Sequence, residues 1–295
     1  GQYEKGWQLF EWGWAAKQRG AQRHTDHPLW TGLQPLKNKT ILLHAEQGYG
    51  DAIQFCRYAK SVSALGAKVV LEVPSPLVEL CQQLEGVHAV IATGQPIADI
   101  DFQCPLMTLP MAFKTTLATI PSEAAYLRAD TTTATHWKNK LSAFTHKKVG
   151  LVWNGGFRPH QPELWLLNSE RNITLEGMAQ VLQHADIDFF SLQKGDPAES
   201  EIRGREKELW PQGNFHNFTA ELKTFSDTAA LIEQLDLVIS VDTSTAHLAA
   251  AMGKPVWLLN RADGCWRWLI DVDHSPWYPS VHLYRQGQDR NWAPV

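Results

Sequence analysis

A short polar stretch between two apolar segments holds the residues best suited to chemistry. Leu237 to Val241 is an apolar, β-branched run that predicts a buried strand, and Leu248 to Met252 is rich in alanine and predicts a helix that Gly253 ends. Between them lie Asp242, Thr243, Ser244, Thr245 and His247. A helix N-terminus exposes backbone N–H groups and the positive end of the helix dipole, and hydroxyl groups add donors. The stretch therefore predicts a site for a phosphorylated ligand, although a lone Asp-Thr pair is more simply an N-cap.

A second polar loop follows the apolar run at residues 41–43. Gly48 and Gly50 allow a tight turn, and Asp51 is placed to cap the helix that follows. The loop is consistent with a turn that only connects a strand to a helix. It is also consistent with a dinucleotide-binding fingerprint in which Glu72 holds the ribose, but Ile53 stands where that fingerprint needs its third glycine.

Alternating strands and helices surround both loops. We expect strands at 41–43, 68–73, 89–92 and 101–106 with helices at 51–65 and 76–84, a short edge element at 126–127, and an interdomain helix at 136–144. A second set has strands at 149–153, 188–192, 237–241 and 256–259, with helices at 174–183, 228–234 and 248–252. This rhythm predicts an α/β protein of two parallel sheets, that is, two Rossmann-like domains facing each other across a cleft.

The bulk properties exclude several classes of protein. The 295 residues are enough for two domains, and a net charge of −4 argues against a nucleic-acid surface. The sequence shows neither a run long enough to be a transmembrane segment nor a signal-peptide pattern. The four cysteines are scattered without CxxC pairing, so neither a zinc site nor a disulfide framework is indicated, and we expect a cytoplasmic protein.

The stretch that begins at Asp242 resembles the signature of the heptosyltransferase-like glycosyltransferases, glycosyltransferase family 9. That signature reads Asp-Thr-Gly-x-x-His-Leu-Ala-x-Ala-x-Gly-x-Pro, and the matching residues are Asp242, Thr243, His247, Leu248, Ala249, Ala251, Gly253 and Pro255. Ser244 replaces the family glycine, so a backbone with positive φ at that position would require a different loop. The segment Gly48-Tyr-Gly-Asp51 resembles a second family motif, which implies that Asp51 is the general base. The resemblance also implies the GT-B architecture.

The remaining donor-site residues follow from strand ends and from the same resemblance. Lys194, preceded by Gln193, comes after the strand at 188–192 and so lies at the same sheet edge as Asp242. The resemblance implies that Arg171 takes the place of a phosphate-facing lysine and that Glu199 contacts the nucleotide ribose, with Glu201 as the alternative. Asn154 follows the strand at 149–153 and is placed to line the donor pocket. The Asp-x-Asp pairs at 99–101, 186–188 and 271–273 do not fall at an evident strand-end site, so we expect no metal and no cofactor beyond the nucleotide-sugar substrate.

The ends of the chain suggest its wider organisation. Tyr3, Trp7, Phe10 and Trp14 form a helical stripe, and the segment resembles the second helix of a tetratricopeptide repeat. We therefore expect a residual repeat helix and linker at 1–36, an acceptor domain at 37–145, a nucleotide-sugar domain at 146–272, and a C-terminal segment at 273–295 that crosses back to the first domain. The aromatic residues around 265–280 predict packing more than a sugar platform.

These features predict a metal-independent, inverting glycosyltransferase that acts by one direct displacement. The donor would be a nucleotide diphosphate sugar, and the acceptor a hydroxyl on a protein, peptide or glycan recruited by upstream tetratricopeptide repeats. Two alternatives stay open. The Ser244 substitution is consistent with a non-catalytic binding or scaffold module on a degenerate GT-B fold, and a nucleotide-sugar epimerase would need no acceptor.

Overall fold

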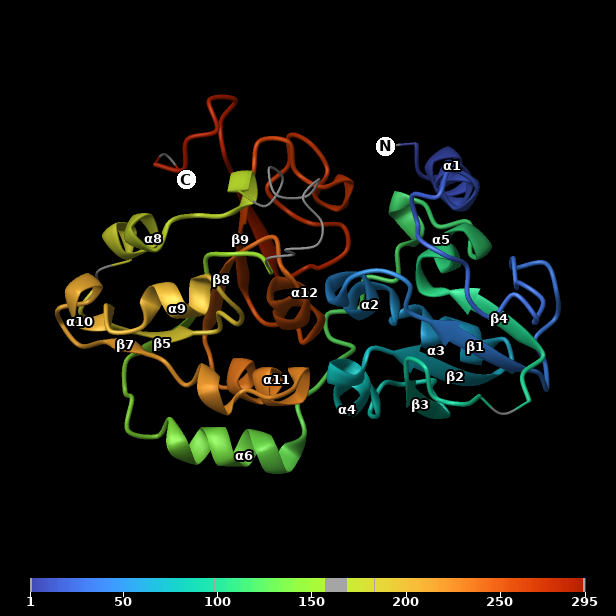
Figure 1. Cartoon of the computed structure of the whole chain (residues 1–295), viewed down its shortest axis with the longest axis horizontal. Coiled ribbons are helices and arrows are strands. Elements are labelled where there is room, and N and C mark those ends of the chain that lie inside the picture. Colours follow the sequence, from blue (N-terminus) through green and yellow to red (C-terminus); the bar gives the residue numbers. More distant parts are fainter. Residues whose placement is uncertain (1, 98, 157–168, 183, 294) are drawn as a thin grey trace. The chain divides into compact units, whose positions relative to one another are not determined.

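The computed structural model describes residues 2–97, 99–156, 169–182, 184–293 and 295 (Figure 1). The chain forms two compact units, which divide between Arg128 and Ala129. Each unit is built on its own parallel sheet, so the predicted α/β fold class with two parallel sheets is confirmed. Within the described residues, no helix is both long and apolar enough to cross a membrane.

The first unit contains a four-stranded parallel sheet in the order β3-β2-β1-β4. Its strands are apolar runs at Thr40–His44 (β1), Lys68–Val73 (β2), Ala89–Ala92 (β3) and Phe102–Pro105 (β4). Its helices are Tyr3–Ala15 (α1), Tyr49–Phe55 (α2), Tyr58–Ala64 (α3), Val78–Cys81 (α4) and Leu109–Ala112 (α5). Ile41 pairs with Val69 on one side and with Phe102 on the other, which places β1 in the interior of the sheet.

The single helix expected at 51–65 is wrong, because the chain turns between α2 and α3. The guanidinium of Arg57 reaches back, with Nε donating to the Gln54 carbonyl at 2.7 Å and Nη2 donating to the Tyr126 hydroxyl at 2.8 Å. Tyr126 in turn donates to the Ile53 carbonyl at 2.9 Å. These bonds hold residues 126–127 as irregular chain beside the turn, so the predicted edge element at that place is also wrong.

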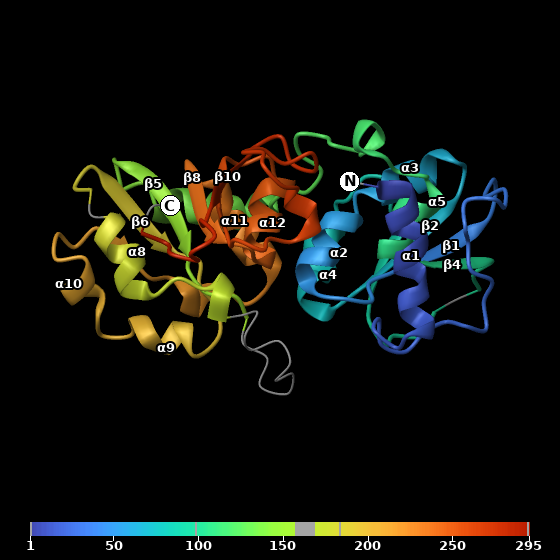
Figure 2. The same cartoon turned by 90° about the horizontal axis from the view of Figure 1, so that it is seen from above.

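Helix α1 packs on the first unit beside α5, as Figures 1 and 2 show. The Trp7 side chain is buried, and its indole N–H donates to the Thr115 carbonyl at 2.8 Å. A buried Trp whose N–H has a partner contributes both apolar area and a satisfied donor. Helix α1 is thus part of the packing of the first unit, while its origin as a repeat helix stays a prediction.

The second unit contains a six-stranded parallel sheet in the order β10-β9-β8-β5-β6-β7. The strands are Lys147–Val152 (β5), Ile187–Ser191 (β6), Phe215–His216 (β7), Leu237–Val241 (β8), Val256–Asn260 (β9) and Val281–Arg285 (β10). The helices are Thr131–Lys140 (α6), Leu175–Val181 (α8), Ala198–Ile202 (α9), Glu206–Leu209 (α10), Phe225–Glu233 (α11) and Ser244–Ala251 (α12). Counted along the unit, this is the 3-2-1-4-5-6 order of a Rossmann sheet.

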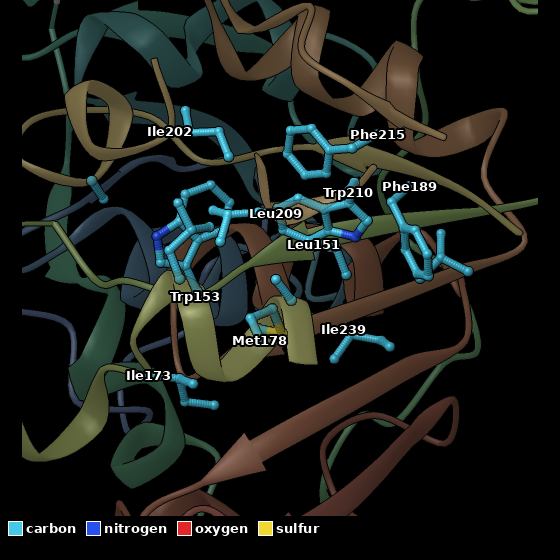
Figure 3. Packing of buried hydrophobic residues seen from close by; sticks show 14 of the residues in the cluster. Leu151, Trp153, Ile173, Met178, Phe189, Ile202, Leu209, Trp210, Phe215 and Ile239 are labelled. Carbon is cyan, nitrogen blue, oxygen red and sulfur yellow. The ribbon is translucent and has the colours of Figure 1, made fainter. Parts of the chain in front are cut away.

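A hydrophobic cluster fixes the strands that lead to the polar loops of this unit (Figure 3). Leu151 on β5, Phe189 on β6 and Ile239 on β8 belong to it. Trp210 and Phe215 belong to the same cluster, and their rings stack with centroids 4.3 Å apart. Burying one such aromatic or aliphatic side chain stabilises a fold by roughly 1.5–3 kcal/mol, so the strand ends are held in place by the core beneath them.

Two of the predicted domain boundaries, at 145/146 and 272/273, fall inside the second unit. Helix α6, expected as an interdomain helix before a boundary near 145, packs on α11 of this unit, and Gln234 on that side donates to the Ala134 carbonyl at 3.3 Å. The segment 273–295 supplies β10, which pairs with β9. The crossing of this segment to the first domain stays a prediction.

Candidate functional site

The carboxyl ends of β5 and β8 lie side by side in the second sheet. The chain leaves β5 toward β6 on one side and leaves β8 toward β9 on the other, so this point is the topological switch of the sheet. Open parallel sheets bind ligands in the crevice at such a point. Asn154 and Gly155 follow β5, and Asp242 follows β8 directly. The structure therefore brings these predicted residues to one edge.

Helix α12 begins earlier than the sequence pattern suggests. Thr243 is its N-cap, and the Thr243 hydroxyl accepts the Ala246 N–H at 3.3 Å. Ser244 is the first helical residue and has no positive φ, so the backbone does not require the family glycine at this position. The predicted loop from Asp242 to His247 is thus only two residues long, and Thr245 and His247 lie in the first turns of the helix. A β-region N-cap threonine favours this early start.

Arg171 lies at the switch point and joins the two strand ends. Its Nη1 donates to the Asp242 carbonyl at 3.0 Å. Its guanidinium also lies against Gly155, where an added Cβ would approach Arg171 Nη2 to 1.9 Å. The Gly155 N–H donates to the Asn172 side chain at 2.8 Å. Only a residue without a side chain at 155 leaves room for this arginine, which gives the glycine a physical role that the sequence did not reveal.

The Gln193 side chain bonds to the backbone of Asn154. The Gln193 Oε1 accepts the Asn154 backbone N–H at 3.0 Å, and the Gln193 Nε2 donates to the Asn154 carbonyl at 3.1 Å. Gln193 is buried, with 3% of its surface exposed. This two-way contact ties the residue after β5 to the residues after β6, so the structure supports a scaffolding role for the Gln193 amide.

Lys194 and Glu199 form a small charged loop at the same edge. The Lys194 ammonium donates to the Thr219 carbonyl at 2.8 Å and lies 3.8 Å from a Glu199 carboxylate oxygen. The other Glu199 oxygen accepts the Gly195 N–H at 3.0 Å. The Lys194 side chain keeps 45% of its surface exposed. Its charge is therefore only partly compensated, because an exposed ion pair at this distance contributes little.

His247 is enclosed by aromatic residues from the β9–β10 connection. It is 5% exposed, its ring stacks on Trp268 with centroids 5.3 Å apart, and its Nδ1 lies 2.8 Å from the Tyr278 hydroxyl. Its Nε2 lies 3.7 Å from an Asp242 carboxylate oxygen. The prediction that this aromatic region mainly packs is confirmed for Trp268 and Tyr278, which are both buried.

In the first unit, the predicted base Asp51 lies in the first turn of α2. The N-cap is Gly48, not Asp51 as predicted, because a carboxylate oxygen of Asp51 reaches back to accept the Gly48 N–H at 3.0 Å. An acidic residue three positions after an N-cap commonly makes this bond. Neither Gly48 nor Gly50 has a positive φ, so these glycines are not required for a left-handed turn.

Glu72 does not serve as the ribose ligand of a dinucleotide fingerprint, because its carboxylate is taken. Glu72 is 1% exposed, and its two oxygens lie 2.6 Å from Arg23 Nη1 and from His24 Nε2. Beside it, the His44 ring contacts Gln103 at 2.9 Å. Burial lowers the pKa of His44 to about 4, so this imidazole is neutral at physiological pH. The dinucleotide alternative is therefore wrong.

A second buried ion pair in this unit was not predicted. Arg19 Nη2 lies 2.8 Å from Glu46 Oε1, which also accepts the Met107 N–H at 3.2 Å, and the Arg19 guanidinium lies over the Phe10 and Trp14 rings. Burial raises the pKa of Glu46 to about 7, and the charge of Arg19 offsets part of that rise. A single glutamate after a strand carries no sequence signal for such a contact.

The Asp-x-Asp pairs have local partners where the structure describes them. Asp101 pairs with Lys39 at 2.8 Å, and Asp188 lies 2.9 Å from His216. Among the described residues, no group of three or more His, Cys, Asp or Glu side chains is arranged to hold a metal ion.

Comparison with known proteins gives these geometric observations a family context. Residues 173–259 match the model of glycosyltransferase family 9 (heptosyltransferase). This part of the chain, called the family 9 region below, is therefore similar to that family. It includes β8, α12 and the Lys194 loop, whereas Asn154 and Arg171 lie just before it.

Similarity to individual proteins extends over most or all of the chain. Protein FlbA of Caulobacter vibrioides is 28% identical over 323 aligned residues, which cover 100% of this chain and 51% of that protein. The chain thus spans about half the length of this curated relative. A family 9 glycosyl transferase structure from Veillonella parvula has a TM-score of 0.61 at 12% identity and covers 86% of this chain and 88% of its own.

A further solved structure, the ADP-heptose LPS heptosyltransferase II of E. coli, has a TM-score of 0.57 at 13% identity, with 84% of this chain and 91% of its own covered. Likeness at such identity establishes a shared fold and leaves function to the site residues. Together with the family 9 match, these findings support glycosyltransferase activity.

Proposed function

We propose that this chain transfers a sugar from a nucleotide diphosphate donor to a hydroxyl acceptor. The observation that carries the proposal is the arrangement at the β5–β8 switch point. There the N-terminus of α12, which belongs to the family 9 region, meets the guanidinium of Arg171. Backbone N–H groups at a helix N-terminus and a fixed arginine are well suited to hold phosphate oxygens.

The donor diphosphate would be held by the second unit without a metal. Thr243, Ser244 and Thr245 offer hydroxyl groups and His247 a ring nitrogen, while Arg171 and Lys194 supply positive charge. Both cations donate to backbone carbonyl groups, those of Asp242 and Thr219 respectively, and these hydrogen bonds help to fix their positions. Glu199 would contact the ribose, and Asn154 and Gln193 would shape the pocket from the ends of β5 and β6.

The chemical step would be a single displacement that inverts the anomeric centre. Asp51 would accept the proton of the attacking acceptor hydroxyl, and the cradle at α12 would stabilise the diphosphate as it leaves. Positioned proton transfer typically contributes a factor of about 10² to 10⁴ to the rate, and charge stabilisation of the leaving group contributes further. The first unit would bind the acceptor, a protein, peptide or glycan, in the cytoplasm, and tetratricopeptide repeats would recruit it.

The donor is identified first, by thermal shift. The full chain is melted with UDP-, GDP-, ADP- and dTDP-sugars at about 1 mM, and a donor present at about 100 times its Kd stabilises the native state by about 2.7 kcal/mol. We expect one nucleotide class to raise Tm clearly above the others. If none of the four classes changes Tm, the donor-binding proposal is wrong.

The base is tested with Asp51→Asn, because an asparagine oxygen still accepts the Gly48 N–H. We expect donor binding to persist while transfer to acceptor falls by about 10² or more. Asp26→Asn is the matched control, since Asp26 is a highly exposed aspartate of the same unit that lies beside His27. Transfer by Asp51→Asn at the wild-type rate would refute the assignment of the base.

The same assays separate the alternatives. Donor binding without hydrolysis or transfer, unchanged by Asp51→Asn, would identify a scaffold module, and conversion of the sugar nucleotide without acceptor would identify an epimerase. The helical conformation of Ser244 removes the backbone argument for a degenerate site. Transfer therefore remains the function that the geometry favours.

A further inference from the structure

Two residues that lie outside the family 9 region contact the His247 ring. Trp268 covers one face of the ring, and the Tyr278 hydroxyl lies 2.8 Å from Nδ1. Both residues come from the connection between β9 and β10, after the last residue of the matched region at 259. The signature thus supplies the histidine, while a later segment determines how that histidine is oriented.

The neighbours of the two ring nitrogens determine where the proton lies. A carboxylate oxygen of Asp242 lies 3.7 Å from Nε2, which is too far for a hydrogen bond, but its negative charge favours an N–H group over a nitrogen lone pair on that side of the ring. The tautomer with hydrogen on Nε2 is therefore favoured. In that tautomer Nδ1 is an acceptor, so the Tyr278 hydroxyl must donate to it.

We propose that Tyr278 is a positioning residue that fixes His247 in the Nε2–H tautomer, so that Nε2–H is presented to an anion at the N-terminus of α12. The inference rests on the proposed function, because the anion would be the donor diphosphate. His247 is the fourth residue of α12, and its Nε2 points toward the side of Asp242, the residue that precedes the N-cap. Without the tyrosine hydroxyl, the hydrogen is free to move to Nδ1, and Nε2 then repels the anion with its lone pair.

The tautomer is measured directly by nitrogen NMR of the ligand-free chain, labelled with ¹⁵N-histidine. The His247 signal is assigned by its absence in His247→Gln. We expect Nε2 of the wild-type ring to have the shift of a protonated nitrogen and Nδ1 that of an unprotonated nitrogen, and we expect this pattern to be lost or mixed in Tyr278→Phe. A protonated Nδ1 in the wild type, or an unchanged pattern in Tyr278→Phe, overturns the proposal. The wild-type measurement does not depend on whether the variant folds.

Anion affinity is measured with inorganic pyrophosphate, the group shared by all candidate donors. Tyr278→Phe removes the hydrogen bond from the Tyr278 hydroxyl to His247 Nδ1, so we expect pyrophosphate to bind about two- to tenfold more weakly. Tyr284→Phe is the matched control, since Tyr284 lies on β10 of the same unit and is only partly buried, and it should leave both the NMR pattern and the Kd unchanged. An equal loss in both variants would mean that Tyr278 acts only through packing, which overturns the proposal.

The two measurements distinguish failure of this inference from failure of the proposed function. If the wild type has the expected tautomer but does not bind pyrophosphate, then the proposed diphosphate site is wrong, and so is the proposal that Nε2–H is presented to an anion. Pyrophosphate binding with the opposite tautomer would leave the donor site intact and would refute the role of Tyr278.

Discussion

Substituting Gly155 by alanine tests whether Arg171 organises the site. An added Cβ at this position would meet Arg171 Nη2 at 1.9 Å, Cζ at 2.3 Å and Nε at 2.6 Å. Carbon atoms do not approach polar atoms so closely, so the guanidinium must move. An arginine side chain is flexible enough to do so without unfolding the unit, but its hydrogen bond to the Asp242 carbonyl at 3.0 Å is then lost.

The size of the effect follows from that bond. Hydrogen bonds that involve a charged group contribute about 1.5–3 kcal/mol. A loss of about 2 kcal/mol lowers Tm by roughly 4–8 °C for a unit of this size. If Arg171 also contacts the donor diphosphate, the same displacement weakens donor binding by roughly tenfold or more, because about 1.4 kcal/mol corresponds to a factor of ten.

The neighbouring glycine provides the control for this experiment. A Cβ added to Gly156 has no atom within 4 Å, so Gly156→Ala should leave Tm and donor affinity close to their wild-type values. Tm is measured by calorimetry, and the Kd for the donor found in the thermal-shift screen is measured by titration. Equal donor affinity in Gly155→Ala and Gly156→Ala would refute the idea that Arg171 must lie against Gly155 for the site to bind.

Three further predictions concern stability. The pKa of Glu46, about 7, exceeds its ordinary value near 4.5, so the protonated carboxyl stabilises the folded state below about pH 4.5 and this stability is lost as the pH rises through 7. Urea unfolding should therefore show the wild type losing up to roughly 3 kcal/mol of unfolding free energy relative to Glu46→Gln over that pH range, and parallel curves of unfolding free energy against pH would contradict this. Gly32→Ala should lower the free energy of unfolding by more than about 3 kcal/mol, because φ is +88° and the new Cβ would lie 2.2 Å from the Ala112 carbonyl oxygen. The control Gly94→Ala has the same φ but open space around the new Cβ, so it should cost only about 1 kcal/mol of backbone strain, and equal Tm values for the two variants would refute the steric argument. Trp7→Phe should lower stability by about 1 kcal/mol through the lost bond to Thr115, and unchanged calorimetric unfolding would show that this bond is not needed to hold α1.

The sequence predicted the parallel sheets because their strands are continuous apolar runs. Residues 68–73, 89–92 and 237–241 were placed with their observed bounds, since buried strands leave a strong local signal. Helix starts were less predictable. Thr243 begins α12 through a side-chain bond to Ala246, and a polar run before an alanine-rich segment does not show which of its hydroxyl groups will make that bond.

Site residues that depend on distant partners could not be predicted from local pattern. The strand Val281–Arg285 was missed because it lies after a segment dense in aromatics and has no helix of its own before it. The contact of Arg171 with Gly155 and the bond between Tyr278 and His247 join residues that are far apart in the chain, and no periodicity records them. The resemblance supplied residue types for the donor site, while the structure showed which of them hold one another.

The two sheets share the 3-2-1-4 strand order, yet their carboxyl edges differ in charge, and this difference decides which one suits an anionic donor. The first edge carries buried carboxylates, Glu46 after β1 and Glu72 at the end of β2, and the nearby Arg19 and Arg23 are engaged in neutralising them. A phosphate placed there would face two acidic groups, while both arginines are already paired with those groups. Breaking either buried ion pair to bind the phosphate is strongly unfavourable. The second edge presents the N-terminus of α12 and the guanidinium of Arg171, which donates to the Asp242 carbonyl, so a diphosphate there would meet backbone N–H donors and positive charge.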